Sequence, residues 1–142
     1  MLNTLQPQEV FALFNQILQI PRPSKHEEQI SQWLVDFAAQ HNIACERDQA
    51  MNVIMRVPAT PGYEEHPGVI LQAHMDMVCE KNSDVQHDFL NDPIQAYVDG
   101  DYLKAKGTTL CGDDGIGGAM ALAALISPTL KHPALECLFT VD

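Results

Sequence analysis

The feature that most constrains the fold is a largely apolar run, Val69–Ala73, that ends in a histidine and, two residues later, an aspartate. Such a run is typical of a strand covered on both faces, as in a parallel sheet. In these sheets, ligands bind at the carboxyl ends of the strands. Because side chains of an extended chain alternate, we expect His74 and Asp76 to point to the same side.

The pair of His74 and Asp76 suits a metal site. Histidine is the commonest metal ligand, and a ligating imidazole usually donates its second ring N–H to a carboxylate or a carbonyl. We therefore expect His74 to be a ligand and Asp76 to orient it. A hydrogen-bonded pair at the end of a strand explains the same pattern, and this simpler explanation is favoured unless a second motif supports a metal.

A second motif, Asp113-Asp114, lies in the glycine-rich segment Gly107–Gly118, which runs into the apolar segment Ala119–Ile126. We expect the apolar segment to be a helix, near whose N-terminus negative charge is favoured. Helix capping therefore explains Asp114 as well as a functional role does. The glycines match neither a phosphate-binding loop nor an EF-hand. What remains is an oxygen donor to join a histidine around a cation such as zinc.

These motifs belong to a longer set of segments: Ile20–Gln29, Glu46–Gln49, Leu71–Val78, His87–Phe89, Asp92–Gln95, Lys106–Leu110 and Asp113–Gly117. With this combination, the chain resembles the aminoacyl-histidine dipeptidases. They belong to the dizinc superfamily that also contains aminoacylases, carboxypeptidases and tripeptidases. The resemblance spans nearly all of the 142 residues and is far more specific than either motif alone.

The resemblance implies a role for each site residue. His74 would bind one zinc ion, Asp76 would hold its imidazole in place as part of the catalytic apparatus, and Asp113 would bridge two zinc ions. Asp114 matches a position that is not a ligand in the family. Two metals about 3.5–4 Å apart can share a carboxylate and an activating water. The implied reaction is hydrolysis of Xaa-His dipeptides, carnosine-like ones included, with manganese or cobalt as alternatives to zinc.

The sequence departs from the family pattern at a few positions near the motifs, namely Met51, Cys79 and Cys111-Gly112. None of these changes removes an expected ligand. Cys111 lies close enough to Asp113 in the sequence for its thiolate to reach a metal there. A buried and unreactive thiol is the favoured interpretation.

The order of helices and strands predicts an α/β fold, as a partial three-layer αβα sandwich with a mixed sheet. We expect residues 1–142 to form the N-terminal part of a metallopeptidase catalytic domain without an internal boundary. By the resemblance, the general base, the remaining ligands and a lid domain would follow Asp142, so the chain alone is expected to be inactive. Aminoacylase or tripeptidase specificity, or a truncated non-catalytic module that binds metal or a partner, stays an alternative.

Local signals place the individual elements. Pro7 suits the first position of a helix that ends near Ile20–Pro23. Ser24 and Glu27 form a Ser-x-x-Glu capping box, which predicts the start of a second helix. The turn Asp99-Gly100 predicts a hairpin. We expect strands at 43–47, 53–57 and 135–141.

Charge and cysteine usage limit the partners. A net charge of −11 disfavours nucleic acid and anionic membrane surfaces. No apolar stretch reaches the roughly 20 residues of a membrane span, and the four cysteines lack Cys-x-x-Cys spacing, which indicates reduced thiols in the cytoplasm. We expect a dipeptide as substrate and, by the resemblance, a homodimer for the complete enzyme. An unpaired sheet edge predicts self-association of the chain alone.

Overall fold

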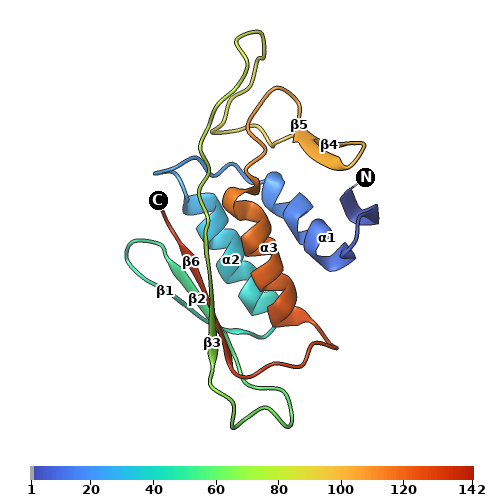
Figure 1. The fold of residues 1–142 in the computed structure, drawn as a ribbon. Coiled ribbons are helices and arrows are strands. Elements are labelled where there is room, and N and C mark those ends of the chain that lie inside the picture. The colour runs from blue at the N-terminus through green and yellow to red at the C-terminus, as the bar shows by residue number, and fades with distance from the viewer. Residues whose placement is uncertain (1) are drawn as a thin grey trace.

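The computed structural model describes residues 2–142 and shows a sheet flanked by helices (Figure 1). The elements in chain order are η1 (Leu2–Thr4), α1 (Gln8–Leu18), α2 (Glu28–Gln40), β1 (Ala44–Arg47), β2 (Val53–Val57), β3 (Val69–His74), β4 (Ala96–Asp99), β5 (Tyr102–Ala105), α3 (Gly112–Ile126) and β6 (Leu135–Thr140).

The main sheet is mixed, with the strand order β1-β2-β6-β3. β6 runs antiparallel to β2 and parallel to β3, with His74 opposite Thr140. The strands β4 and β5 form a separate antiparallel hairpin. The predicted α/β fold with a mixed sheet is therefore confirmed.

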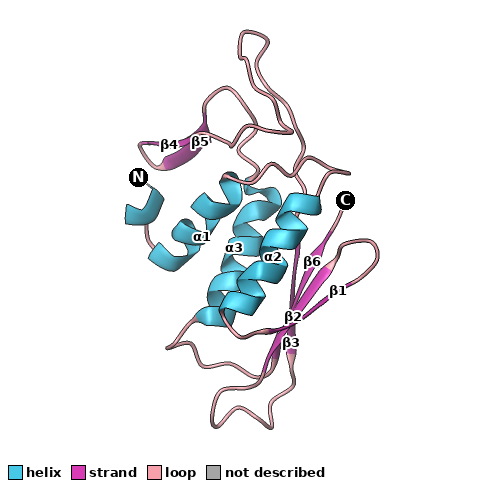
Figure 2. Ribbon diagram, turned by 180° about the vertical axis from the view of Figure 1, so that it is seen from behind, coloured by secondary structure: helices cyan, strands magenta, loops and turns pink. Residues whose placement is uncertain are grey.

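The three α-helices lie on one face of the main sheet (Figure 2). The core between them contains Val53, Ala73, Leu122 and Phe139, each at most 2% exposed. Helix α3 packs against both β3 and α1. Of the three layers expected, the described residues thus form two, a helical layer and the sheet.

Within residues 2–142, the strand that carries His74 is covered on one face only, whereas the sequence predicts cover on both faces. Val69 and Ile70 are 42% and 65% exposed, whereas Ala73 is buried. The reason is that β3 is an edge strand of the sheet and the helices lie on one side only. An apolar run indicates that a strand is suited to burial on both faces, but it does not tell whether a second layer covers the strand.

The predicted capping box is also wrong. Helix α2 begins at Glu28, and no side chain caps its N-terminus. Lys25 has a positive φ of 72°, and its backbone N–H donates to Glu27 Oε1 at 2.8 Å. The Ser24 hydroxyl instead donates to the carboxylate of Asp76. A tertiary contact has therefore replaced the local cap.

The other elements follow the sequence closely. The strands expected at 43–47, 53–57 and 135–141 correspond to β1, β2 and β6, and the expected hairpin is formed by β4 and β5. Pro7 lies immediately before the first residue of α1 rather than within the helix. No helix among residues 2–142 is long and apolar enough to span a bilayer.

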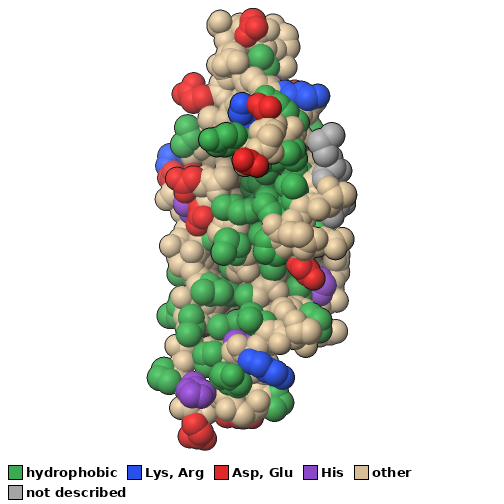
Figure 3. Space-filling view, turned by 45° about the vertical axis from the view of Figure 1, so that its right-hand side comes forward, with side chains coloured by type: hydrophobic (Ala, Val, Ile, Leu, Met, Phe, Trp, Pro, Cys, Tyr) green, Lys and Arg blue, Asp and Glu red, His purple; other side chains and the backbone are tan. Residues whose placement is uncertain are grey.

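Apolar side chains remain on the surface of the described chain, and Figure 3 shows them in a broad band along one face of the molecule. The most exposed include Ile70 in β3, Tyr102 in β5, Met120 in α3 and Val78, which lies outside these elements. An edge strand with exposed apolar residues is a template for pairing with another chain. The self-association expected from the sequence stays a prediction, and this surface is where it would occur.

We predict that Ile70→Lys reduces self-association of the chain at micromolar concentration, because a charge on an edge strand opposes edge-to-edge pairing. Sedimentation velocity measures the effect. Met120→Lys is the matched control, since it removes an exposed apolar side chain from a helix without touching the sheet edge. A wild-type chain that is monomeric at these concentrations would contradict the prediction.

Candidate metal centre

The three predicted site residues come together at one end of the sheet. His74 is the last residue of β3, Asp76 follows it, and Asp113 lies in the first turn of α3. His74 Nδ1 is 2.9 Å from Asp76 Oδ1. On the other side of the ring, His74 Nε2 is 3.1 Å from Asp113 Oδ1. The imidazole is thus held between two carboxylates, and the contact between His74 and Asp76 is the one that strand alternation predicts.

The three side chains differ in their access to solvent. The Asp76 side chain is 11% exposed, that of His74 is 36% exposed and that of Asp113 is 97% exposed. Asp76 therefore lies on the protein side of the imidazole, and Asp113 lies on the solvent side. The arrangement leaves the carboxylate of Asp113 accessible to a ligand.

The two carboxylates control the pKa of His74. Burial alone lowers this pKa, but the hydrogen bonds with Asp113 and Asp76 and the charges of both carboxylates raise it by more, so the net shift is upward. The imidazolium form is favoured because each ring N–H meets an acceptor. Loss of the proton at Nε2 leaves a lone pair directed at Asp113, which is the state in which a histidine binds metal.

An irregular turn presents the acidic pair at the start of α3. Cys111 has a left-handed backbone with φ 63°, and both Asp113 and Asp114 depart from helical φ and ψ. The peptide bond between the two aspartates is cis. A Cβ atom at Gly117 would lie 2.2 Å from Asp114 Oδ1, so glycine at this position provides the space for that carboxylate.

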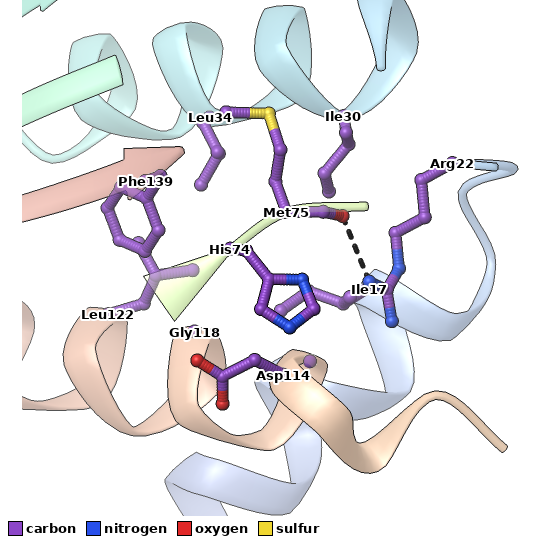
Figure 4. A pocket seen from close by; sticks show the side chains of 11 residues that line it. Ile17, Arg22, Ile30, Leu34, His74, Met75, Asp114, Gly118, Leu122 and Phe139 are labelled. Carbon is purple, nitrogen blue, oxygen red and sulfur yellow. Dashed lines mark hydrogen bonds between the residues drawn. The ribbon is translucent and has the colours of Figure 1, made fainter. Parts of the chain in front are cut away.

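A small cavity lies behind His74 (Figure 4). Its volume is about 20 Å³, and its polar lining consists of Arg22, His74 and Asp114. A cavity of this size has room for about one water molecule. The cavity is therefore too small to hold a larger ligand.

Two residues of the site were not predicted as such, Arg22 and Ser24. The Ser24 hydroxyl donates to Asp76 Oδ2, so the second oxygen of this carboxylate is also held. The buried Arg22 side chain contacts the backbone of both segments that carry the site. Both residues lie in the segment Ile20–Gln29 that is shared with the family, but a capping signal and a flanking pair of prolines do not reveal such long-range contacts.

Cys111 is buried, with 8% of its surface exposed. Burial raises the pKa of its thiol, and its Sγ lies 3.2 Å from Met77 Sδ. These surroundings match the unreactive thiol that the sequence favoured over a metal-binding thiolate.

The described residues fit part of a metal site. His74 Nε2 and Asp113 Oδ1, 3.1 Å apart, are close enough to bind one ion at the usual distances of about 2.0–2.2 Å. Across residues 2–142, no group of three or more His, Cys, Asp or Glu side chains gathers as a complete site. A zinc site usually has three or four protein ligands. This chain therefore supplies two candidate donors and the carboxylate that orients one of them.

Comparison with known proteins identifies relatives of this chain. No family model matches the chain. The cytosol non-specific dipeptidase of Escherichia coli (strain K12) is 49% identical over 140 residues, which are 99% of this chain and 29% of that protein. The chain is a homologue of this dipeptidase. The resemblance found in the sequence is thereby confirmed.

Solved structures show the same relationship. The aminoacylhistidine dipeptidase of Vibrio alginolyticus matches all of this chain and 29% of its own length, with a TM-score of 0.98 and 48% identity. A Bacillus subtilis protein, described as a dinuclear metal-binding peptidase of the M20 family, shares the fold at a TM-score of 0.55 and 14% identity, over 94% of this chain and 35% of its own. The chain thus spans about 29% of each dipeptidase relative.

The raised pKa of His74 predicts how the stability of this chain, free of metal, depends on pH. A histidine whose pKa is higher in the folded state adds stability below its unfolded pKa of about 6.5, and this contribution is lost as pH rises through the folded pKa. The stability difference between wild type and His74→Gln should therefore shrink as pH rises from 5.5 to 8.5. Urea unfolding of both proteins in the presence of a chelator, repeated at each pH, measures this difference in the free energy of unfolding.

The Asp113→Asn variant provides the internal check. It removes one of the two carboxylates that raise the pKa of His74. The stability lost on His74→Gln should therefore depend less on pH when Asp113→Asn is already present. A difference between wild type and His74→Gln that is the same at all pH values would contradict the assignment.

Proposed function

We propose that this chain supplies part of the two-metal catalytic centre of a cytoplasmic dipeptidase that hydrolyses Xaa-His dipeptides, carnosine-like ones included. The observation that carries the proposal is the His74 ring between Asp76 and Asp113 at the carboxyl end of β3. The name of the E. coli relative, a non-specific dipeptidase, supports dipeptides as substrates, and that of the V. alginolyticus structure supports the Xaa-His class. The name of the B. subtilis structure supports a pair of metals.

In this proposal each residue has a separate task. Asp76 accepts a hydrogen bond from His74 Nδ1–H, which fixes the tautomer and directs the lone pair of Nε2 outwards. Asp113 has one oxygen beside His74 and an exposed carboxylate, which suits a bridging ligand. Ser24 holds the second oxygen of Asp76. When bound, the metal pair would supply an activated water and a polarised amide carbonyl, so no serine or cysteine nucleophile is needed.

Several features of the complete enzyme belong to the proposal as well. Zinc is the proposed metal, with manganese or cobalt as alternatives, since histidine and carboxylate ligands suit all three ions. The attacking water needs a base within hydrogen-bond reach, and we assign that role to none of the described residues. We also propose that the chain is the first part of one catalytic domain, and that the complete enzyme is a homodimer.

The decisive test is hydrolysis of β-alanyl-histidine by the protein made from its complete gene, loaded with zinc. His74→Ala and Asp113→Asn should each lower kcat/KM by at least about 100-fold, because the first removes a proposed metal ligand and the second replaces a bridging carboxylate by a neutral amide with one oxygen. Asp76→Asn should lower it by about 10- to 100-fold, which is typical of groups that orient a ligand. Steady-state kinetics with metal analysis of each variant provide the measurement.

The matched control is His66→Ala, since His66 is exposed on the loop at the opposite end of β3. Its activity should equal that of the wild type. Full activity in His74→Ala would refute the site. Turnover of N-acyl amino acids or tripeptides in place of Xaa-His dipeptides would leave the site intact and support the aminoacylase or tripeptidase alternative.

We further predict that the 142-residue chain with added zinc gives no appreciable hydrolysis of β-alanyl-histidine. Residues 2–142 contain only part of a metal site, and a hydrolytic water without a base reacts slowly. The assay needs a preparation whose mass is verified, to exclude longer products. Robust turnover by that preparation would contradict the prediction, whereas metal binding without turnover would agree with it and also suit the non-catalytic alternative.

A further inference from the structure

The site contains a buried cation that the proposed reaction does not use. Arg22 is 1% exposed. Its Nη1 donates to the carbonyl oxygen of Met75 at 2.9 Å and to that of Asp76 at 3.1 Å. Its Nη2 donates to the carbonyl oxygen of Cys111 at 3.1 Å. Figure 4 shows the side chain beside His74, with the bond to Met75 dashed.

The three carbonyl groups belong to the two segments that carry the candidate ligands. Met75 and Asp76 directly follow His74 at the end of β3, and Cys111 lies two residues before Asp113. One planar guanidinium therefore links the backbone next to His74 with the backbone next to Asp113. Because the donors of arginine form a rigid fork, this link fixes direction as well as distance.

The backbone around Arg22 strengthens the attachment to the histidine segment. The carbonyl oxygen of Arg22 accepts a hydrogen bond from the N–H of Met77 at 2.9 Å, and Ser24 N–H donates to Met77 O at 3.2 Å. Pro23 pairs with Met77 as an isolated parallel bridge. Arg22 is thus anchored alongside residues 75–77, and its side chain extends from there to Cys111.

Burying a guanidinium is costly, which argues that its geometry matters. Burial lowers the pKa of Arg22, while nearby acidic groups, Asp76 and Asp114 among them, raise it. Its three hydrogen bonds within residues 2–142 all go to backbone carbonyl groups. An apolar side chain would fill the same space without the cost of desolvation, but it would leave the three carbonyl groups without these donors.

A second observation, at Gly115, points to the same role. A Cβ atom there would lie 2.6 Å from Arg22 Nη2 and 3.0 Å from Phe14 Cε2. Glycine in the first turn of α3 therefore provides the space that the guanidinium occupies. The glycine-rich motif around the acidic pair and the buried arginine form one arrangement.

We propose that Arg22 is a positioning residue, which sets the separation between His74 Nε2 and Asp113 Oδ1 and thereby the affinity of this chain for a divalent cation. The inference rests on the proposed function, because it takes these two groups to be metal ligands. Arg22 itself touches neither the ion nor the substrate. It acts through the backbone of the two segments that it joins.

The test compares Arg22→Met, Arg22→Lys and Gly115→Ala with the wild type, each made as the protein of the complete gene. One readout is the affinity and visible spectrum of bound Co²⁺. The other is the ¹⁵N spectrum of the His74 ring in the metal-free chain at one fixed pH, which reports its tautomer and hydrogen bonds. Arg47→Met is the matched control, since Arg47 is exposed and donates to Gln32 Oε1.

We expect Arg22→Met to weaken Co²⁺ binding by about 10- to 100-fold, the range typical of groups that support metal ligands, and to shift the His74 ring signals. Gly115→Ala should act in the same direction, because it displaces the guanidinium. Arg22→Lys should recover part of the affinity, since an ammonium can still donate to the carbonyl groups. Arg47→Met should leave both readouts at their wild-type values.

The proposal is overturned if Arg22→Met folds and keeps the wild-type His74 signals and Co²⁺ affinity. If that variant does not fold, unchanged readouts in both Arg22→Lys and Gly115→Ala overturn it. A wild-type protein made from the complete gene that binds no Co²⁺ would count against the proposed function. The His74 ring spectra of the variants would still decide whether Arg22 positions the imidazole.

Discussion

The parallel pairing of β3 with β6 is the constraint on which the site depends. Parallel neighbours cannot be joined by a tight turn and need a long crossover connection, usually with a helix. In this chain α3 lies in that connection and packs on β3. A crossover helix runs back along the sheet, so its N-terminus lies near the end at which β3 finishes. For this reason His74 and Asp113 meet although 39 residues separate them.

Sequence reasoning could find the parts of the site that follow from local geometry. The alternation of an extended chain places His74 and Asp76 on one side, and the structure shows them in contact. The position of Asp113 beside them came from the resemblance, because no local pattern states which loop will return to the end of a strand. The strands and the hairpin were also predictable, since turn residues and apolar runs mark them directly.

The misses have a common physical origin in long-range contacts. Ser24 has a strong local signal for a helix cap, but its hydroxyl instead meets the carboxylate of Asp76. An apolar run at Val69–Ala73 suggests cover on both sides, whereas the outer face of Ile70 is exposed because the helices lie on the other side. The role of Arg22 could not be predicted from the sequence, because it depends on carbonyl groups in segments 53 and 89 residues away.

The exposure of Asp113 affects the order in which a two-ion site would fill. Its side chain is 97% exposed, and His74 is the one hydrogen-bond partner of its carboxylate within residues 2–142. Such a side chain retains much of its rotamer freedom, and the first ion to bind has to restrict it. An ion that shares the same carboxylate would then find it already ordered. The loss of conformational entropy would fall on the first binding event, which is a source of positive cooperativity between two ions without any movement of the backbone.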